Sequence, residues 1–177
     1  MASRKIEDLV PEVQEKAKTV VEKCRSAGVD LLIYCTLRGL DEQAILYRQS
    51  RTRSEIISKM DKLRQRGYGF LADIIDSVGP QSGPHVTNAA PGESWHNYAE
   101  AWDAVPLING KAMWSYDENK QLWQVYGNAV AEAGLDWAGN WTGFVEHPHA
   151  QLRKGGNPLT LHEPDEIKEI LISNGLL

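Results

Sequence analysis

The chain has 177 residues, of which 42% are hydrophobic and 24% charged, so it can build one hydrophobic core. Nineteen Lys and Arg against 24 Asp and Glu give a net charge of -5, which argues against a strongly electrostatic nucleic-acid binder. No apolar run reaches the roughly 18 residues that a membrane span requires. Disordered, collagen-like and membrane-spanning classes are excluded, and we expect one domain over residues 1–177.

The first half of the chain is expected to form helices around one buried strand. Apolar residues at helical spacing predict a helix from Pro11 to Gly28, and the apolar segment 30–36 predicts a strand. Asp41 is expected to cap a second helix. A third helix is predicted from Ser54 to Gly67, and a short fourth one over residues 70–78.

The middle of the chain combines a loop with a hairpin. Residues 79–92 are rich in Gly and Pro and lack apolar periodicity, which predicts a long loop. Residues 101–107 are predicted as a strand, and Asn109-Gly110 is a strong hairpin turn signal before a return strand over 111–114.

The last third adds two helices and a strand. Asp117 is expected to cap a helix that ends at Gly134, residues 144–152 are predicted as a strand, and 164–173 as a final helix. This order indicates an α+β fold with a small, mostly antiparallel sheet flanked by helices. Cys24 and Cys35 are expected to be two buried thiols rather than a disulfide framework.

Histidines and acidic residues gather in segments 94–103 and 146–149. If His96 and Asp103 bind one metal, each lies about 2.0–2.2 Å from it. Seven residues of helix separate two positions by roughly 10 Å, and seven of strand by roughly 23 Å on opposite faces. Neither a regular helix nor a straight strand can bring His96 and Asp103 to one metal ion. The chain must therefore bend between these two residues, at residues 97–99.

His149 is the candidate third ligand, because two histidines and one aspartate leave a fourth position open for water, as in catalytic zinc sites. Glu146 lies three residues earlier and is the candidate general base. Alone, Glu-x-x-His has little specificity and favours a solvated loop by a wide margin. Together with the segment that holds His96 and Asp103, it favours a metal site. Arg38 follows the first strand and is either a solvated turn residue or a clamp on the substrate.

The first of these segments resembles the zinc D-Ala-D-Ala carboxypeptidase and L-alanyl-D-glutamate endopeptidase family, which includes phage endolysins and shares the hedgehog-like fold. The family pattern Ser-x-His-x-x-Gly-x-Ala-x-Asp is matched by Ser94, His96, Ala101 and Asp103. Ala99 stands where the family has glycine, which makes the bend less permissive without changing a ligand.

The second family motif, an acidic residue two positions before Pro-His, is matched by Glu146, Pro148 and His149. Residues 36–43 resemble the arginine-containing strand end and Glu-Gln helix of the family, and the resemblance covers roughly residues 11–152. A family-specific insertion is expected around residues 54–84. The resemblance implies these roles: Zn2+ ligands His96, Asp103 and His149; catalytic residues Glu146 and Arg38; substrate contacts Ser94 and His147. His147-Pro148-His149 also resembles the His-x-His of lysostaphin-like relatives, in which the first histidine assists catalysis.

The resemblance implies a zinc metallopeptidase that hydrolyses peptidoglycan stem peptides, with the L-Ala-D-Glu bond favoured, in a phage or prophage endolysin. We expect a monomer that binds no nucleic acid and is not a membrane protein. The first eight residues lack a signal-peptide pattern, so synthesis in the host cytoplasm and action at the cell wall or periplasm after release are expected. The alternatives are a D-Ala-D-Ala carboxypeptidase of the same fold and a non-catalytic zinc-containing binding module.

Overall fold

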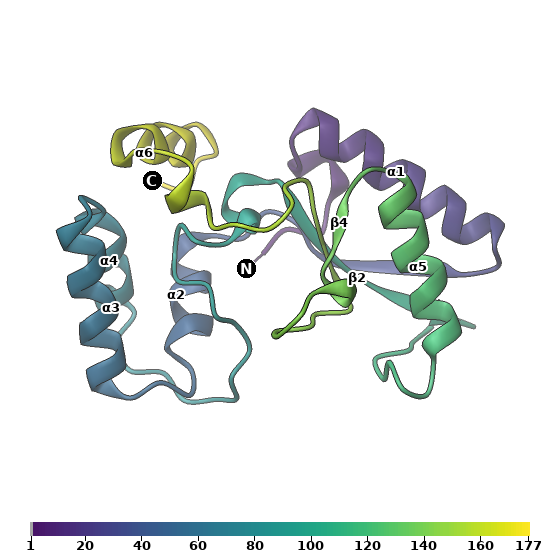
Figure 1. Cartoon of the computed structure of the whole chain (residues 1–177), viewed down its shortest axis with the longest axis horizontal. Coiled ribbons are helices and arrows are strands. Elements are labelled where there is room, and N and C mark those ends of the chain that lie inside the picture. Colours follow the sequence, from purple (N-terminus) through teal and green to yellow (C-terminus); the bar gives the residue numbers. More distant parts are fainter. Residues whose placement is uncertain (1) are drawn as a thin grey trace. The chain divides into compact units, whose positions relative to one another are not determined.

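The computed structural model describes residues 2–177 and confirms the α+β class, with one small sheet whose paired strands are all antiparallel (Figure 1). The described chain divides into two compact units. The sheet unit comprises residues 2–37 and 99–155, and the helical unit comprises residues 38–98 and 156–177. Because each unit combines two separate segments, this division fits one domain as well as two, and the single domain stays a prediction.

The sheet unit contains two helices, two 3-10 turns and all five strands. The strands follow the order β1-β2-β5-β4, and β3 pairs with β2 beside this path. The helices are α1 (Pro11–Ser26) and α5 (Lys120–Glu132), the 3-10 turns are Ile6–Asp8 and Ala138–Asn140, and the strands are β1 (Asp30–Cys35), β2 (Ala101–Ile108), β3 (Lys111–Ala112), β4 (Asp136–Trp137) and β5 (His149–Gln151).

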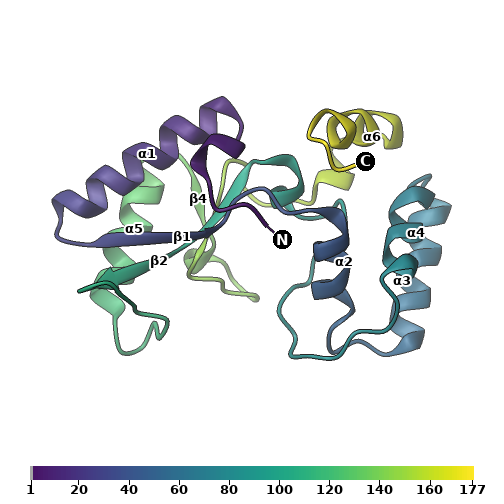
Figure 2. The ribbon, with the colours of Figure 1, turned by 180° about the vertical axis from the view of Figure 1, so that it is seen from behind.

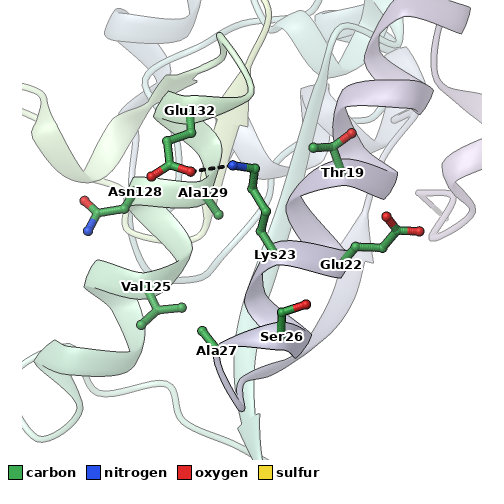
Figure 3. Close-up of a pocket in the computed structure, with 9 residues that line it drawn as sticks. All are labelled: Thr19, Glu22, Lys23, Ser26, Ala27, Val125, Asn128, Ala129 and Glu132. Carbon is green, nitrogen blue, oxygen red and sulfur yellow. Dashed lines mark hydrogen bonds and ion pairs between the residues drawn. The ribbon is translucent and has the colours of Figure 1, made fainter.

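Helices α1 and α5 pack beside each other against the sheet (Figures 1 and 2). Residues on one stripe of α1 meet Trp102 of β2 and Trp123 and Tyr126 of α5 in a single core. At the surface, Lys23 of α1 forms an ion pair with Glu132 of α5 beside a shallow groove (Figure 3). The described residues that line this groove include no histidine or cysteine.

The hairpin prediction is confirmed, and the strand predictions near it need correction. Asn109 and Gly110 both have positive φ, 50° and 76°, as a type I′ turn requires. The return strand is shorter than expected and ends at Ala112. Residues 144–152 form a strand only over His149–Gln151, because the chain turns before it: the backbone N–H of His149 donates to the carbonyl of Glu146.

The helical unit contains four helices and two 3-10 turns and has no strand among its described residues. Residues 54–84 contribute a pair of helices, α3 and α4, that pack against each other. The elements of the unit are α2 (Leu40–Arg48), α3 (Arg53–Gln65), α4 (Gly69–Ser77), α6 (Pro164–Ser173) and the 3-10 turns Trp95–Tyr98 and Pro158–Thr160.

The helix positions are confirmed, whereas two predicted caps are wrong. Gly39 is the N-cap residue of α2, and Asp41 lies within its first turn. Asn119 is the N-cap residue of α5, because a turn closed by its N–H and the Tyr116 carbonyl takes up the residues around Asp117. Cys24 and Cys35 are buried thiols that form no disulfide, as expected. None of the helices described is long and apolar enough to cross a membrane.

Candidate metal centre and catalytic residues

Asp103 and His149 lie side by side on neighbouring strands of the sheet unit. They are partners in the β2–β5 register, and Asp103 Oδ1 lies 3.0 Å from His149 Nδ1. Both residues are only 8% exposed. The sequence separates them by 46 positions, so only the antiparallel pairing of β2 with β5 brings these two donor atoms together.

Strand alternation explains why these polar side chains share one face. Successive side chains of a strand point to opposite faces. Trp102, Ala104 and Ala150 belong to the core with α1 and α5, so Asp103 and His149 point away from those helices. The buried face of the sheet thus fixes the direction of the candidate ligands.

Both imidazole nitrogens of His149 have a buried partner. Nδ1 faces Asp103, and Nε2 lies 3.0 Å from the side-chain oxygen Oε1 of Gln151, two residues further along β5. Burial lowers the pKa of His149, but the hydrogen bond and charge of Asp103, the charge of Glu146 and the hydrogen bond with Gln151 together raise it by more, so the pKa lies above its usual value. Sequence reasoning missed Gln151, although the i, i+2 spacing on a strand places it on the same face as His149.

Three hydrogen bonds hold the backbone just before His149. The Tyr126 hydroxyl donates to the carbonyl of Pro148 at 2.9 Å, and the N–H of Ala104 donates to the same oxygen at 3.1 Å. The indole Nε1 of Trp137 donates to the carbonyl of His147 at 2.7 Å. Helix α5 and strands β2 and β4 therefore anchor the segment from which Glu146 projects.

Glu146 is half-buried and lies one tight turn before His149, whose N–H donates to its carbonyl at 3.1 Å. The negative charge of Glu146 contributes to the raised pKa of His149. His147 has different surroundings, because its ring stacks on Tyr116 with centroids 3.7 Å apart. Burial lowers the pKa of His147, which favours a neutral ring at neutral pH.

The remaining candidates lie in the helical unit. The 3-10 turn Trp95–Tyr98 follows Ser94 directly and holds His96, which is buried. The backbone carbonyl of His96 accepts a hydrogen bond from the N–H of Arg38 at 3.1 Å. The Nη1 of Arg38 donates to Gln43 Oε1 at 3.0 Å, and Gln43 Nε2 in turn donates to the Ala89 carbonyl at 2.8 Å. The described structure thus gathers Arg38, Ser94 and His96 in one unit, and a centre shared with Asp103 and His149 stays a prediction.

The backbone between His96 and Asp103 bends where the metal hypothesis requires. The 3-10 turn ends at Tyr98, and Ala99 has φ 56°, in the left-handed region that favours glycine. Strand β2 begins two residues later, at Ala101. Ala99 therefore carries backbone strain at the position where the family pattern has glycine.

The donor set of the sheet unit fits a divalent cation. Two ligands on one tetrahedral zinc lie about 3.4 Å apart, which follows from metal–ligand distances of about 2.0–2.2 Å. Asp103 Oδ1 and His149 Nδ1 are 3.0 Å apart, so they need to separate only slightly. Cys35 is the register partner of Asp103 on β1, and its Sγ lies within 4.8 Å of the Asp103 carboxylate. Sequence reasoning assigned Cys35 only to the core because strand register is not readable from spacing.

Comparison with known proteins gives two sequence matches and one structural match. A model of the D-alanyl-D-alanine carboxypeptidase family matches residues 87–152, the range that holds His96, Asp103, Glu146 and His149. The peptidoglycan L-alanyl-D-glutamate endopeptidase CwlK of Bacillus subtilis is 28% identical over 151 residues, or 82% of this chain and 74% of the relative. The crystal structure of the Serratia marcescens L-Ala D-Glu endopeptidase ChiX aligns with a TM-score of 0.45 and 17% identity, over 86% of this chain and 89% of that one.

The two sequence matches and the ligand motifs agree on one class of protein, the metallopeptidases that cut peptidoglycan peptides. Residues 87–152 match the D-alanyl-D-alanine carboxypeptidase family, and the chain resembles an L-alanyl-D-glutamate endopeptidase over most of its length, in agreement with its sequence motifs.

Proposed function

We propose that this protein is a zinc metallopeptidase that hydrolyses the L-Ala-D-Glu bond of peptidoglycan stem peptides. One observation carries the proposal: a buried Asp103–His149 pair with donor atoms 3.0 Å apart, and the Glu146 carboxylate one turn earlier. The relationship to CwlK favours the L-Ala-D-Glu bond. The description of the matching family favours a second candidate bond, the terminal D-Ala-D-Ala bond.

In this proposal Asp103 Oδ1, His149 Nδ1 and the His96 imidazole hold the zinc ion. When bound, zinc polarises the scissile carbonyl and makes a water molecule a stronger nucleophile at neutral pH. The resemblance carries His96 into the ligand set, and the bend at Ala99 meets its backbone requirement. Two histidines and one aspartate leave a position open for catalysis, which a purely structural site does not need.

Glu146 acts as the general base in this reaction. Its carboxylate takes a proton from the attacking water as the oxygen bonds to the carbonyl carbon, and then gives that proton to the leaving amine as the C–N bond breaks. The anchors on the carbonyls of His147 and Pro148 keep Glu146 in place. The presence of Glu146 in the motif argues against a non-catalytic binding module, because a purely structural site needs no general base.

Arg38 is proposed to hold the substrate carbonyl or a nearby carboxylate through its guanidinium group. Gln43 holds one edge of that group by accepting a hydrogen bond from Nη1. Ser94 and His147 are proposed as substrate contacts. The biological role that we propose is a monomeric phage or prophage endolysin acting at the cell wall, and the resemblance to a family that includes endolysins supports it.

The test compares zinc content and hydrolysis in matched variants. Glu146→Gln should retain zinc and the fold while hydrolysis of a muropeptide falls by roughly 100-fold or more, the usual contribution of a general base. His149→Ala should lose zinc together with activity. Glu118→Gln, at an exposed glutamate, is the matched control and should behave like the wild type. Unchanged hydrolysis in Glu146→Gln, or full zinc retention in His149→Ala, would refute the proposal.

A further inference from the structure

The side chain of Gln151 is buried and bonded at both ends. It is 3% exposed, its Oε1 lies 3.0 Å from His149 Nε2, and its Nε2 donates to the backbone carbonyl of Arg153 at 2.5 Å. The family motif does not include this position. Its two bonds nevertheless determine which nitrogen of His149 carries a proton.

The chain of reasoning starts at the Arg153 carbonyl, which can only accept a hydrogen bond. The amide nitrogen of Gln151 must therefore face Arg153, and the amide oxygen must face His149. An amide oxygen also only accepts, so His149 Nε2 has to carry the proton. Without a metal, Nδ1 also donates, to Asp103 Oδ1 at 3.0 Å, since an ionised carboxylate only accepts. A cation bound beside Asp103 would replace that proton and take the Nδ1 lone pair, while Nε2 keeps its proton.

The surroundings of Gln151 keep this orientation fixed. The Arg153 side chain bonds to Glu100 at 2.9 Å, and the N–H of Leu152 donates to the Glu100 carbonyl at 2.9 Å. The backbone around the Arg153 carbonyl is thus held in place by Glu100, the residue just before β2. Since His149 and Gln151 lie two residues apart on β5, they share the face on which Asp103 also lies.

We propose that Gln151 is a positioning residue for the metal: it holds His149 as the Nε2–H tautomer and so presents the Nδ1 lone pair to the cation beside Asp103. This inference rests on the proposed function, because it assumes that His149 is a ligand. A second hydrogen-bond partner on the far nitrogen of a ligating histidine orients the ring and raises its basicity. Removal of such a partner typically weakens metal binding by about 10–100-fold.

The first test uses the wild-type protein with 15N-labelled histidine and bound zinc. Two-bond 15N–1H correlation spectra should show a proton on His149 Nε2 and no proton on Nδ1. A proton on Nδ1, with the metal on Nε2, would overturn the inference. Because this measurement requires no substitution at Gln151, it stands even where a variant fails to fold.

The second test measures zinc affinity by competition with a chromophoric chelator. Gln151→Met keeps the length of the side chain but cannot accept from Nε2–H, and we expect its zinc affinity to fall by about 10–100-fold. Gln151→Glu keeps an acceptor and should stay within a few-fold of the wild type, which a purely structural role would not explain. Equal affinities for Gln151→Met and the wild type would overturn the inference.

His149→Ala separates this inference from the proposed function. If His149→Ala loses zinc while Gln151→Met binds it normally, only the role of Gln151 is wrong. If His149→Ala binds zinc as tightly as the wild type, the metal centre itself is wrong.

Discussion

Substitution of Gly127 by alanine should destabilise the protein, although alanine is the better helix former. Gly127 lies inside α5, where alanine usually stabilises by about 1 kcal/mol relative to glycine. A Cβ at this position would lie 2.2 Å from Cε3 and 2.3 Å from Cζ3 of Trp137, far inside the ordinary contact distance of about 3.5–4.0 Å. The Trp137 ring must move.

The ring has little room to move. A Cβ on Gly139 would lie 2.3 Å from Cε2 of Trp137, so the indole fits between two positions that lack side chains. Trp137 is 3% exposed, and its Nε1 donates to the His147 carbonyl. Overpacking costs about 1–3 kcal/mol or more, and loss of the hydrogen bond about 1 kcal/mol. After the helix gain is subtracted, we expect the free energy of unfolding to fall by about 1–3 kcal/mol.

Thermal and urea unfolding followed by circular dichroism measure this change. A fall of that size lowers the melting temperature by roughly 2–12 °C in a chain of this length. Gly69→Ala is the control, because the nearest atom to its Cβ, Arg64 Cγ, lies at an ordinary 4.0 Å, and it should be neutral or slightly stabilising. In a Trp137→Leu background, Gly127→Ala should lose most of its cost. A stabilising Gly127→Ala, or the same cost in both backgrounds, would refute the packing argument.

Three further predictions concern single residues of the sheet unit. Ala99→Gly relieves about 1–2 kcal/mol of left-handed backbone strain and removes a buried methyl worth about 0.8 kcal/mol. Thermal unfolding should therefore show a free energy of unfolding higher by up to about 1 kcal/mol, and a lower melting temperature would contradict the strain. Tyr126→Phe removes the bond to the Pro148 carbonyl and should lower the free energy of urea unfolding by about 1 kcal/mol, whereas no change would show that this bond contributes nothing. Burial raises the pKa of Cys24 to about 11, and only the thiolate reacts with alkylating reagents. Iodoacetamide at pH 8 should therefore label Cys24 far more slowly in the folded than in the unfolded protein. Equal labelling rates would disprove its burial.

Local signals in the sequence were sufficient to predict most of the elements. The apolar stripe of α1 and the Pro at position 164 placed two helices, and Asn109-Gly110 placed the hairpin. The strand predicted over residues 144–152 forms only at β5, because residues 146–149 make a turn that depends on backbone hydrogen bonds with distant elements. Apolar residues at 144 and 145 carried no sign of that turn.

The candidate site was only partly predictable for a related reason. Motif spacing identified Asp103 and His149, which the structure brings to 3.0 Å, but it could not show that Cys35 is the register partner of Asp103. Gln151 bears no motif and depends on the carbonyl of Arg153. Contacts of this kind come from strand register and from backbone acceptors, which leave no pattern in the composition or periodicity of the sequence.

The most direct test of the central claim is mass spectrometry of the products released from a defined pentapeptide muropeptide, with and without a chelator. We expect a cut between L-Ala and D-Glu that the chelator abolishes and added zinc restores. Loss of a single terminal D-Ala would instead identify the carboxypeptidase. A substrate left intact by zinc-loaded protein would contradict the assignment as a peptidoglycan peptidase.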